Sequence, residues 1–344
     1  MKIIDAHTHV FPHHAHLAVD VMDRCGIDRV ITLEWHDGFG DTLRKHLEIF
    51  NAYDSRFVVF GNVDWRLVND HGFGETAAGQ IESGVSLGMR GLKIYKSLGL
   101  SYRRPNGKVW AINDPAFDPI WEKAGERRIP ILIHTADPVF FWQPVDENNF
   151  WNGVLYGEYA GWSYYQKDYP DREKLLADRN DVIARHPKTT FICPHVGSKS
   201  DSLDRAAEDL DAFPNLHYDL SARIPILGLS AAHAARTRAF MTRYQDRMLL
   251  GTDMIYDDTN VPTGIQAQCL YQPGEFPLGD ADPDKKYVET SVAFFQSHLD
   301  FLTTGKIQTD PPFKRNRNGF SIAGLDLPRE VCENILHRNI SRLI

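Results

Sequence analysis

The stretch KIIDAHTHV at residues 2–10 combines an apolar, strand-like run with two histidines that lie one residue apart. Residues two positions apart on a β-strand point to the same side, so His7 and His9 can both face one metal ion. The spacing alone is weak support, because 15 histidines placed at random in 344 residues produce such a pair about as often as not. A second pair, His14 and His16, follows no strand-like run and is interpreted as part of a loop. The meaning of the first pair therefore depends on the rest of the chain.

Similar apolar runs recur along the chain and alternate with helix-like stretches. After residues 2–7 they occupy residues 28–35, 56–65, 90–95, 129–135, 189–195, 215–221 and 246–253. Continuous apolar runs of this length are typical of parallel strands that are buried on both faces. Eight such repeats predict an α/β fold, a (β/α)8 TIM barrel. An open, doubly wound sheet is the alternative, and it is less favoured because no glycine-rich phosphate loop follows the first run.

The overall composition is that of a globular protein and agrees with a single domain over residues 1–344. The net charge of −8 argues against nucleic acid as a partner. The first residues lack the features of a signal peptide, and no apolar run is long enough to span a membrane, so we expect a cytoplasmic protein. The four cysteines are scattered without CxxC spacing, which agrees with reduced thiols. The expected partner is a small-molecule substrate, and a homo-oligomer is compatible with the sequence.

Metal-ligating residue types lie at the ends of the predicted strands, where the active site of a barrel is built. The residues at these ends are His7 with His9, Lys93, His134, His195 and Asp253. Singly, each could be structural, since a lone histidine in an apolar run is usually a hydrogen-bonded core residue. The imidazoles of His7, His9 and His134 and the carboxylate of Asp253 would form a ligand set that suits Zn²⁺, with Mn²⁺, Fe²⁺ or Co²⁺ as alternatives. Asp5 shares the predicted face of the strand, and we expect it to orient one of the two rings.

The ordered motifs resemble those of the amidohydrolase superfamily. They are DAHTH at residues 5–9, ILIHT around His134, ICPHVG around His195, LLGTD at residues 249–253 and ILHRNISRLI at residues 335–344. Within the superfamily, the pattern is similar to the amidohydrolase-related group that includes aminocarboxymuconate semialdehyde decarboxylase. The resemblance implies a distorted barrel with one divalent ion held by His7, His9, His134 and Asp253. It also implies that His195 is a catalytic residue that polarises the substrate near the metal.

Lys93 leaves the number of metal ions open. Binuclear members of the superfamily use a carbamylated lysine from the fourth strand as a bridging ligand, and Lys93 lies near that place in GLKIYKS. The simpler interpretation is a lysine at the barrel mouth that pairs with a carboxylate of the protein or the substrate. The second interpretation is preferred, and it predicts one metal ion for each chain.

Three functions are compatible with these residues. In a metal-dependent hydrolase, metal-activated water would attack an amide, ester or lactone, with Asp253 moving the proton and His195 donating to the developing oxyanion. In a nonoxidative decarboxylase or other lyase, the same groups would act on an aromatic or dicarboxylic acid. The third alternative is a barrel that has lost its chemistry and only binds a ligand. The hydrolase is the leading hypothesis.

Two long insertions, after the fifth and the eighth strand, are predicted to border the site. Residues 138–170 hold 11 aromatic residues and are interpreted as a lid whose Trp142 could contact the substrate. An oligomer contact would explain the same composition equally well. Arg223, after the seventh strand, could bind a substrate carboxylate or form a structural ion pair. Residues 254–284 lack clear periodicity and are expected to form a second wall.

Overall fold

The structure is a computed structural model that describes residues 1–155, 157–256, 283–309, 311–312 and 321–344. Nine parallel strands form its main sheet, in the order β8-β7-β6-β5-β4-β3-β2-β1-β9. The strands are β1 (Ile4–Val10), β2 (Arg29–Leu33), β3 (Phe57–Gly61), β4 (Gly91–Ile94), β5 (Ile131–Ile133), β6 (Phe191–Cys193), β7 (Leu216–Asp219), β8 (Met248–Leu249) and β9 (Met254–Tyr256). The second to eighth predicted runs contain β2 to β8, the first run covers the first four residues of β1, and β9 directly follows the eighth run.

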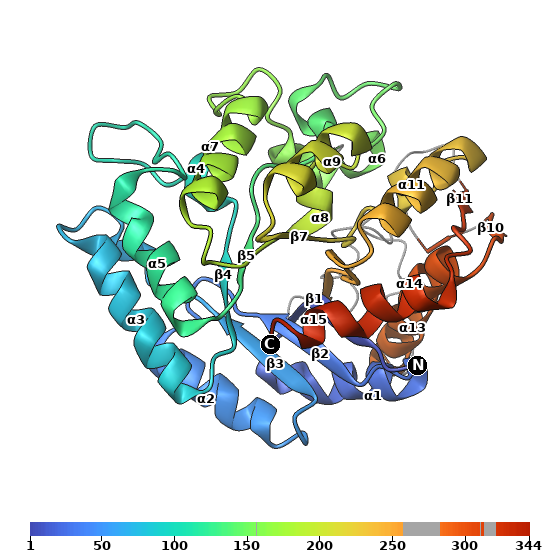
Figure 1. Cartoon of the computed structure of the whole chain (residues 1–344), viewed down its shortest axis with the longest axis horizontal. Helices are drawn as coiled ribbons and strands as arrows, with labels where there is room; N and C mark the ends of the chain where they lie inside the picture. Colours follow the sequence, from blue (N-terminus) through green and yellow to red (C-terminus); the bar gives the residue numbers. More distant parts are fainter. Residues whose placement is uncertain (156, 257–282, 310, 313–320) are drawn as a thin grey trace.

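The eighth run closes the barrel. β8 pairs with β7, and β9 pairs with β1. Between these two strands, the backbone NH of Ala6 donates to the carbonyl of Leu250, and that of Asp253 donates to the carbonyl of His7, both at 2.8 Å. The curled sheet in Figure 1 therefore meets itself at residues 250–253, which makes the fold a distorted (β/α)8 barrel, as the sequence predicted.

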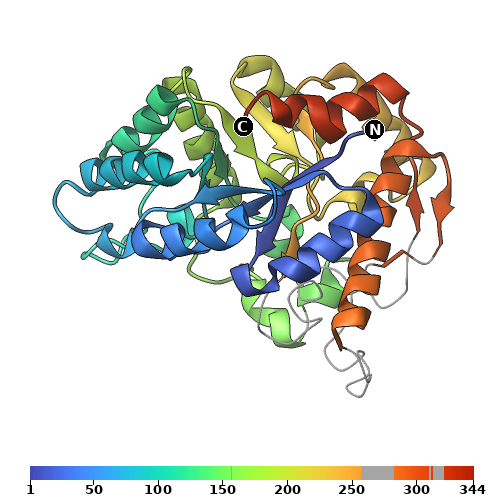
Figure 2. The ribbon, with the colours of Figure 1, turned by 90° about the horizontal axis from the view of Figure 1, so that it is seen from below.

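Helices lie on the outer side of the curled sheet (Figures 1 and 2). The long ones are α1 (Ala15–Cys25), α2 (Gly40–Asn51), α3 (Phe73–Leu87), α5 (Asp118–Arg127), α7 (Arg172–Arg185), α9 (Leu203–Ala212), α11 (Ala231–Arg243) and α13 (Pro283–Thr303). Short helical elements are η1 (Pro12–His14), η2 (Trp65–Leu67), α4 (Ser97–Leu100), η3 (Pro115–Phe117), α8 (Pro194–Gly197) and α10 (Ile224–Leu227). The C-terminal part contains β10 (Ile307–Gln308), β11 (Ile322–Ala323), α14 (Arg329–Glu333), the π-helical η6 (Asn334–Arg338) and α15 (Asn339–Ser341). No helix in these described ranges is both long and apolar enough to cross a membrane.

Both faces of the strands are buried, which explains why their sequences are continuously apolar. Alternate residues fill the barrel interior, namely Ile4, Ala6, Ile31, Leu33, Val58, Phe60, Leu132, Ile192 and Leu249, and Ile340 of α15 packs against them. The intervening residues, such as Val30, Val59 and Phe191, pack against the helices in a second apolar cluster. This two-sided burial holds the strand ends, and so the side chains at the barrel mouth, in fixed positions.

The two predicted insertions differ in how much of them the structure describes. The segment 138–170 carries three short helical elements, η4 (Val139–Trp142), α6 (Asn152–Leu155) and η5 (Gly157–Trp162), so it is not a long open loop. The predicted boundary of the second insertion at residue 254 is wrong, because residues 254–256 form β9 against β1. Its last two residues, 283 and 284, begin α13, and residues 257–282 lie outside the described part of the chain.

Candidate metal centre

His7 and His9 on β1 both turn their Nε2 atoms toward the barrel mouth. The Nδ1 atom of His7 is 2.8 Å from a carboxylate oxygen of Asp219, and Nδ1 of His9 is 3.0 Å from the carbonyl oxygen of Leu33. Both Nδ1 atoms therefore donate to acceptors, which leaves the two Nε2 atoms unprotonated in the neutral rings. These Nε2 atoms lie 3.2 and 3.6 Å from Oδ1 of Asp253. The two Nε2 atoms thus face the same carboxylate, as expected for two side chains on one strand face.

Asp253 reaches this position because the eighth strand breaks just before it. Its backbone adopts the left-handed conformation, with φ at 64°. Burial alone would raise the pKa of this carboxyl group, but the neighbouring imidazoles of His7, His195 and His9 hold the pKa below its ordinary value. Gly251 precedes it in the GTD motif, and a Cβ atom there would lie 2.9 Å from Cβ of His7. The glycine is therefore required by the close approach of the eighth strand to β1.

His195 follows β6 in a turn with unusual backbone geometry. Residues 195–198 all have φ near +60°. Two arginines of α7 stabilise this turn. Buried Arg179 donates to the carbonyl of Gly197 at 2.8 Å, and Arg172 donates to the carbonyl of Ser198. The Nδ1 atom of His195 lies 2.8 Å from the carbonyl oxygen of Ser221, and burial lowers the pKa of the ring to about 3. Neutral His195 therefore carries its proton on Nδ1 and presents a lone pair at Nε2.

His134 extends β5 by one residue and faces His195, with 4.5 Å between the ring centroids. Its Nε2 atom is buried and has no hydrogen-bond partner among the described residues. The nearest carboxylate oxygen is Oδ1 of Asp137, at 3.8 Å. A buried ring nitrogen without a partner is costly in a folded protein, and a ligand would satisfy it.

The structure brings five of the predicted site residues to one end of the barrel, although not with equal spacing. These five cluster residues are His7, His9, His134, His195 and Asp253. Ligand atoms of His7, His195 and Asp253 all lie within 4.8 Å of one another. His9 contacts the same carboxylate through Nε2, while His134 contacts the cluster through His195. His195, for which the sequence predicted a catalytic role, thus lies as close to Asp253 as a ligand would.

The residues predicted to contact substrate are only partly near this cluster. Lys93 on β4 is buried, and burial lowers the pKa of its ammonium group to about 8 while the charges of Asp253 and Asp219 oppose that shift. Arg223 is buried before α10, with its guanidinium 5.5 Å from the ring centroid of Trp151. Trp142 contacts residues of its own segment 138–170. Its Nε1–H donates to the carbonyl of Pro170, the last residue of that segment.

The prediction that Asp5 orients one of the two rings is wrong, because its oxygens have other donors. Asp5 accepts hydrogen bonds from the hydroxyl and NH of Thr252 and from the backbone NH of His7. The register of β1 shifts between residues 5 and 8, so the simple alternation of faces does not extend to Asp5. Asp219, at the end of β7, holds the His7 ring instead. It could have been found from the sequence, because it is the carboxylate within the seventh run, two residues before the end of that run.

The aromatic segment 138–170 is joined to the cluster through Asp137. Oδ2 of Asp137 accepts from the hydroxyl of Tyr164 and from the ammonium of Lys96, both at 2.6 Å. Its other oxygen faces His134. Asp137 thus connects the barrel mouth to the segment that the sequence interpreted as a lid.

A parallel (β/α)8 barrel with four histidines and an aspartate at its strand ends defines a class of barrel enzyme with a metal-type site. The family model described as Amidohydrolase matches residues 4–296, and the chain belongs to this family. It is therefore an enzyme of the amidohydrolase superfamily, whose members are metal-dependent.

Solved structures with the same fold include enzymes of different reactions. The structure of 2,6-dihydroxybenzoate decarboxylase from Rhizobium is 14% identical with a TM-score of 0.53, and the match covers 100% of this chain and 98% of that one. A structure described as a probable 2-pyrone-4,6-dicarboxylic acid hydrolase from Acinetobacter baumannii is 11% identical with a TM-score of 0.50, covering 100% and 99%. The comparison with curated proteins finds no match. At these identities the likeness shows the fold, and the reaction has to be argued from the site.

Proposed function

We propose that this chain is a metal-dependent hydrolase that acts on an amide, ester or lactone of a small molecule. The observation that carries the proposal is the common orientation of His7 and His9, whose Nδ1 atoms are both engaged so that both Nε2 atoms face Asp253. Such fixation of the outer ring nitrogen is how proteins prepare histidines as metal ligands.

The residues present fit one divalent cation. His7, His9, His134 and Asp253 would hold it, and Nε2 of His134, which lacks a hydrogen-bond partner in the described part of the chain, supports its place in the set. Three nitrogens and one oxygen suit Zn²⁺, with Mn²⁺, Fe²⁺ and Co²⁺ as alternatives. When bound, such an ion supplies a Lewis acid and lowers the pKa of a coordinated water to about 7.

Asp253 and His195 are the groups placed to move protons. Asp253 is the carboxylate that faces the Nε2 atoms of His7 and His9 and is held in its ionised form, so it can accept a proton and later return it to the leaving group. Neutral His195 cannot donate through Nε2 while its proton is on Nδ1, so it serves first as an acceptor or a ligand and donates only after taking up a proton. Lys93 and Arg223 supply positive charge for an anionic part of the substrate.

The test is a metal analysis combined with a substrate screen over amides, esters and lactones. We expect about one divalent ion for each chain and turnover that is lost in Asp253→Asn. Asp204→Asn, an exposed aspartate on α9, is the matched control and should keep full activity. His195→Gln separates its two roles, because a ligand role predicts loss of metal, whereas a proton-transfer role predicts bound metal and low kcat. A chain that binds no divalent metal would contradict the proposal and favour a non-catalytic binding barrel.

Decarboxylation of an aromatic or dicarboxylic acid is the second candidate, favoured by the two buried cations. Lys93 and Arg223 lie at the barrel mouth, and Trp151 of the aromatic segment lies beside Arg223. A carboxylate on the substrate would pair with such cations. Release of CO2 from candidate acids, with no turnover of lactones or amides, would replace the hydrolase by the lyase.

A further inference from the structure

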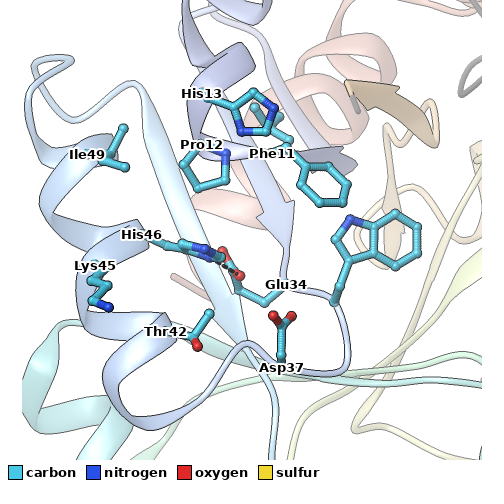
Figure 3. A pocket seen from close by; sticks show the side chains of 11 residues that line it. Phe11, Pro12, His13, Glu34, Asp37, Thr42, Lys45, His46 and Ile49 are labelled. Atoms are coloured by element: carbon cyan, nitrogen blue, oxygen red, sulfur yellow. Dashed lines mark hydrogen bonds and ion pairs between the residues drawn. The ribbon is translucent and has the colours of Figure 1, made fainter. Parts of the chain in front are cut away.

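A cavity of about 350 Å³ lies outside the group of His7, His9, His134, His195 and Asp253, and Figure 3 shows the side chains that line it. It is bounded by the segment that follows β1, the segment that follows β2, and α2. None of the five cluster residues lines it. Its volume falls in the range of small-molecule sites.

The floor of this pocket is a buried carboxylate that holds an imidazole ring. Oε2 of Glu34 lies 2.6 Å from Nδ1 of His46, and only 3% of the Glu34 side chain is exposed. Nδ1 is therefore committed to Glu34, and Nε2 is the ring nitrogen left to contact a ligand. Burial alone would lower the pKa of His46, but Glu34 and then Asp37 raise it, which favours the charged form of the ring, a donor at both nitrogens.

The walls divide into a charged half and an apolar half. Figure 3 shows Asp37 on the same side of the pocket as His46, with Phe11 and Pro12 across from them. Lys45 precedes His46 on α2, and neither Lys45 nor Asp37 forms an ion pair within the described part of the chain. Such a pocket offers donors, an acceptor and a surface on which a flat ring can lie.

The pocket shares one wall with the metal cluster. Trp35 lines the pocket and also stacks on the ring of His9, with 4.6 Å between the centroids. The hydroxyl of Tyr95 donates to the carbonyl of Glu34 and lies 3.4 Å from Nδ1 of His9. A ligand that shifts Trp35 would therefore also change the packing of His9, a residue of the cluster.

We infer that this pocket is a second binding site, for a small aromatic carboxylic acid that also carries an N–H or O–H donor. The carboxylate lies against Nε2 of His46 and the ammonium of Lys45, the donor group faces Asp37, and the ring packs on Trp35 and Phe11. The site is independent of the reaction proposed above, because it uses none of the residues assigned to it.

Other ligand classes fit these residues less well. A simple cation would meet Lys45 and the charged ring of His46, and an acid without a donor would leave Asp37 facing a negative charge without compensation. A metal ion is not favoured, because the described residues that line the pocket do not form a converging set of three or more metal-type ligand atoms. Across the described ranges, the group of three or more metal-type ligand atoms that converge within 4.8 Å is that of His7, His195 and Asp253.

The test is calorimetric titration of the metal-loaded chain with 3-aminobenzoate, and with benzoate and aniline as probes that each lack one group. We expect 3-aminobenzoate to bind at least roughly tenfold more tightly than either, which is the scale of one hydrogen bond to a charged group. Equal binding of benzoate or aniline, or no binding of any probe, would overturn the inference.

Matched variants assign the binding to this pocket. Lys45→Glu reverses the charge at an exposed position and should weaken the binding of 3-aminobenzoate by at least roughly tenfold, the scale of one charged hydrogen bond. Lys188→Glu, at an exposed position after α7, is the control and should leave the affinity for 3-aminobenzoate unchanged. His46→Gln keeps a donor for Glu34 and should also weaken binding, with thermal unfolding as the check on folding. Binding that survives Lys45→Glu but disappears in Arg223→Gln would place the probe in the metal centre and contradict the inference.

Discussion

Replacing Asp219 with asparagine should weaken metal binding while leaving the shape of the side chain unchanged. Oδ2 of Asp219 faces Nδ1 of His7 at 2.8 Å. Oδ1 accepts from the backbone NH groups of His195 and Ser221, at 2.9 and 3.0 Å, and from the Ser221 hydroxyl. An asparagine must keep its oxygen on the side of these three donors, so its NH2 group faces His7. His7 then has to accept at Nδ1 and carry its proton on Nε2, where it can no longer bind a cation.

The expected size follows from this change of tautomer. A hydrogen bond to a charged group contributes about 1.5–3 kcal/mol, and loss of a carboxylate behind a metal-bound histidine typically weakens metal binding by about 10–100-fold. The two figures agree, because each factor of ten corresponds to about 1.4 kcal/mol. If the amide instead turns its oxygen toward His7, two backbone NH groups face an NH2 group, and the free energy of unfolding falls by about 1–3 kcal/mol.

Metal affinity can be measured by competition with a fluorescent chelator, alongside thermal unfolding of the metal-free chain. Asp204→Asn is the control, since that carboxylate is exposed and, among the described residues, pairs with Arg236. A folded Asp219→Asn variant that binds metal as tightly as the unchanged chain would refute the reasoning, because it would show that His7 is not prepared as a ligand by this contact.

Three further predictions concern other parts of the molecule. Gly251→Ala should displace His7, lowering the free energy of unfolding by about 1–3 kcal/mol and also weakening metal binding; a variant unchanged in chemical denaturation and metal titration would show that the strand can shift. Tyr164→Phe removes the hydroxyl that donates to Asp137 and should raise KM more than it lowers kcat, while an unchanged KM would argue against the segment 138–170 as a lid. His298 is fully buried with a pKa lowered by burial to about 4, so the unfolded chain binds the proton first and stability is lost as the pH falls from about 6.5 toward 4. In His298→Leu, the loss of unfolding free energy between pH 7 and pH 4.5 should be smaller by roughly 2.5 kcal/mol, and an equal loss in both proteins would contradict the assignment.

The barrel and the position of its mouth could be predicted from the sequence because both depend on local, repeated patterns. Eight apolar runs alternate with helix-like stretches, and parallel strands buried on both faces require such runs. Since the strands run in one direction, the residues at their ends had to gather at one end of the barrel. This reasoning predicted that His7, His134, His195 and Asp253 lie close together, and the structure brings their side chains to one end of the barrel.

The partners of these residues depended on contacts across the barrel. A side chain two positions before His7 seemed placed to hold its ring, but the shift in register of β1 directs Asp5 to Thr252, and the ring is held by Asp219, 212 residues away. The break in the eighth strand, which sets the backbone of Asp253, was also not visible in the sequence. The local sequence thus determines which type of residue lies at each strand end. The hydrogen bonds that decide which ring atom faces the candidate metal centre form only when β7 and β8 close against β1.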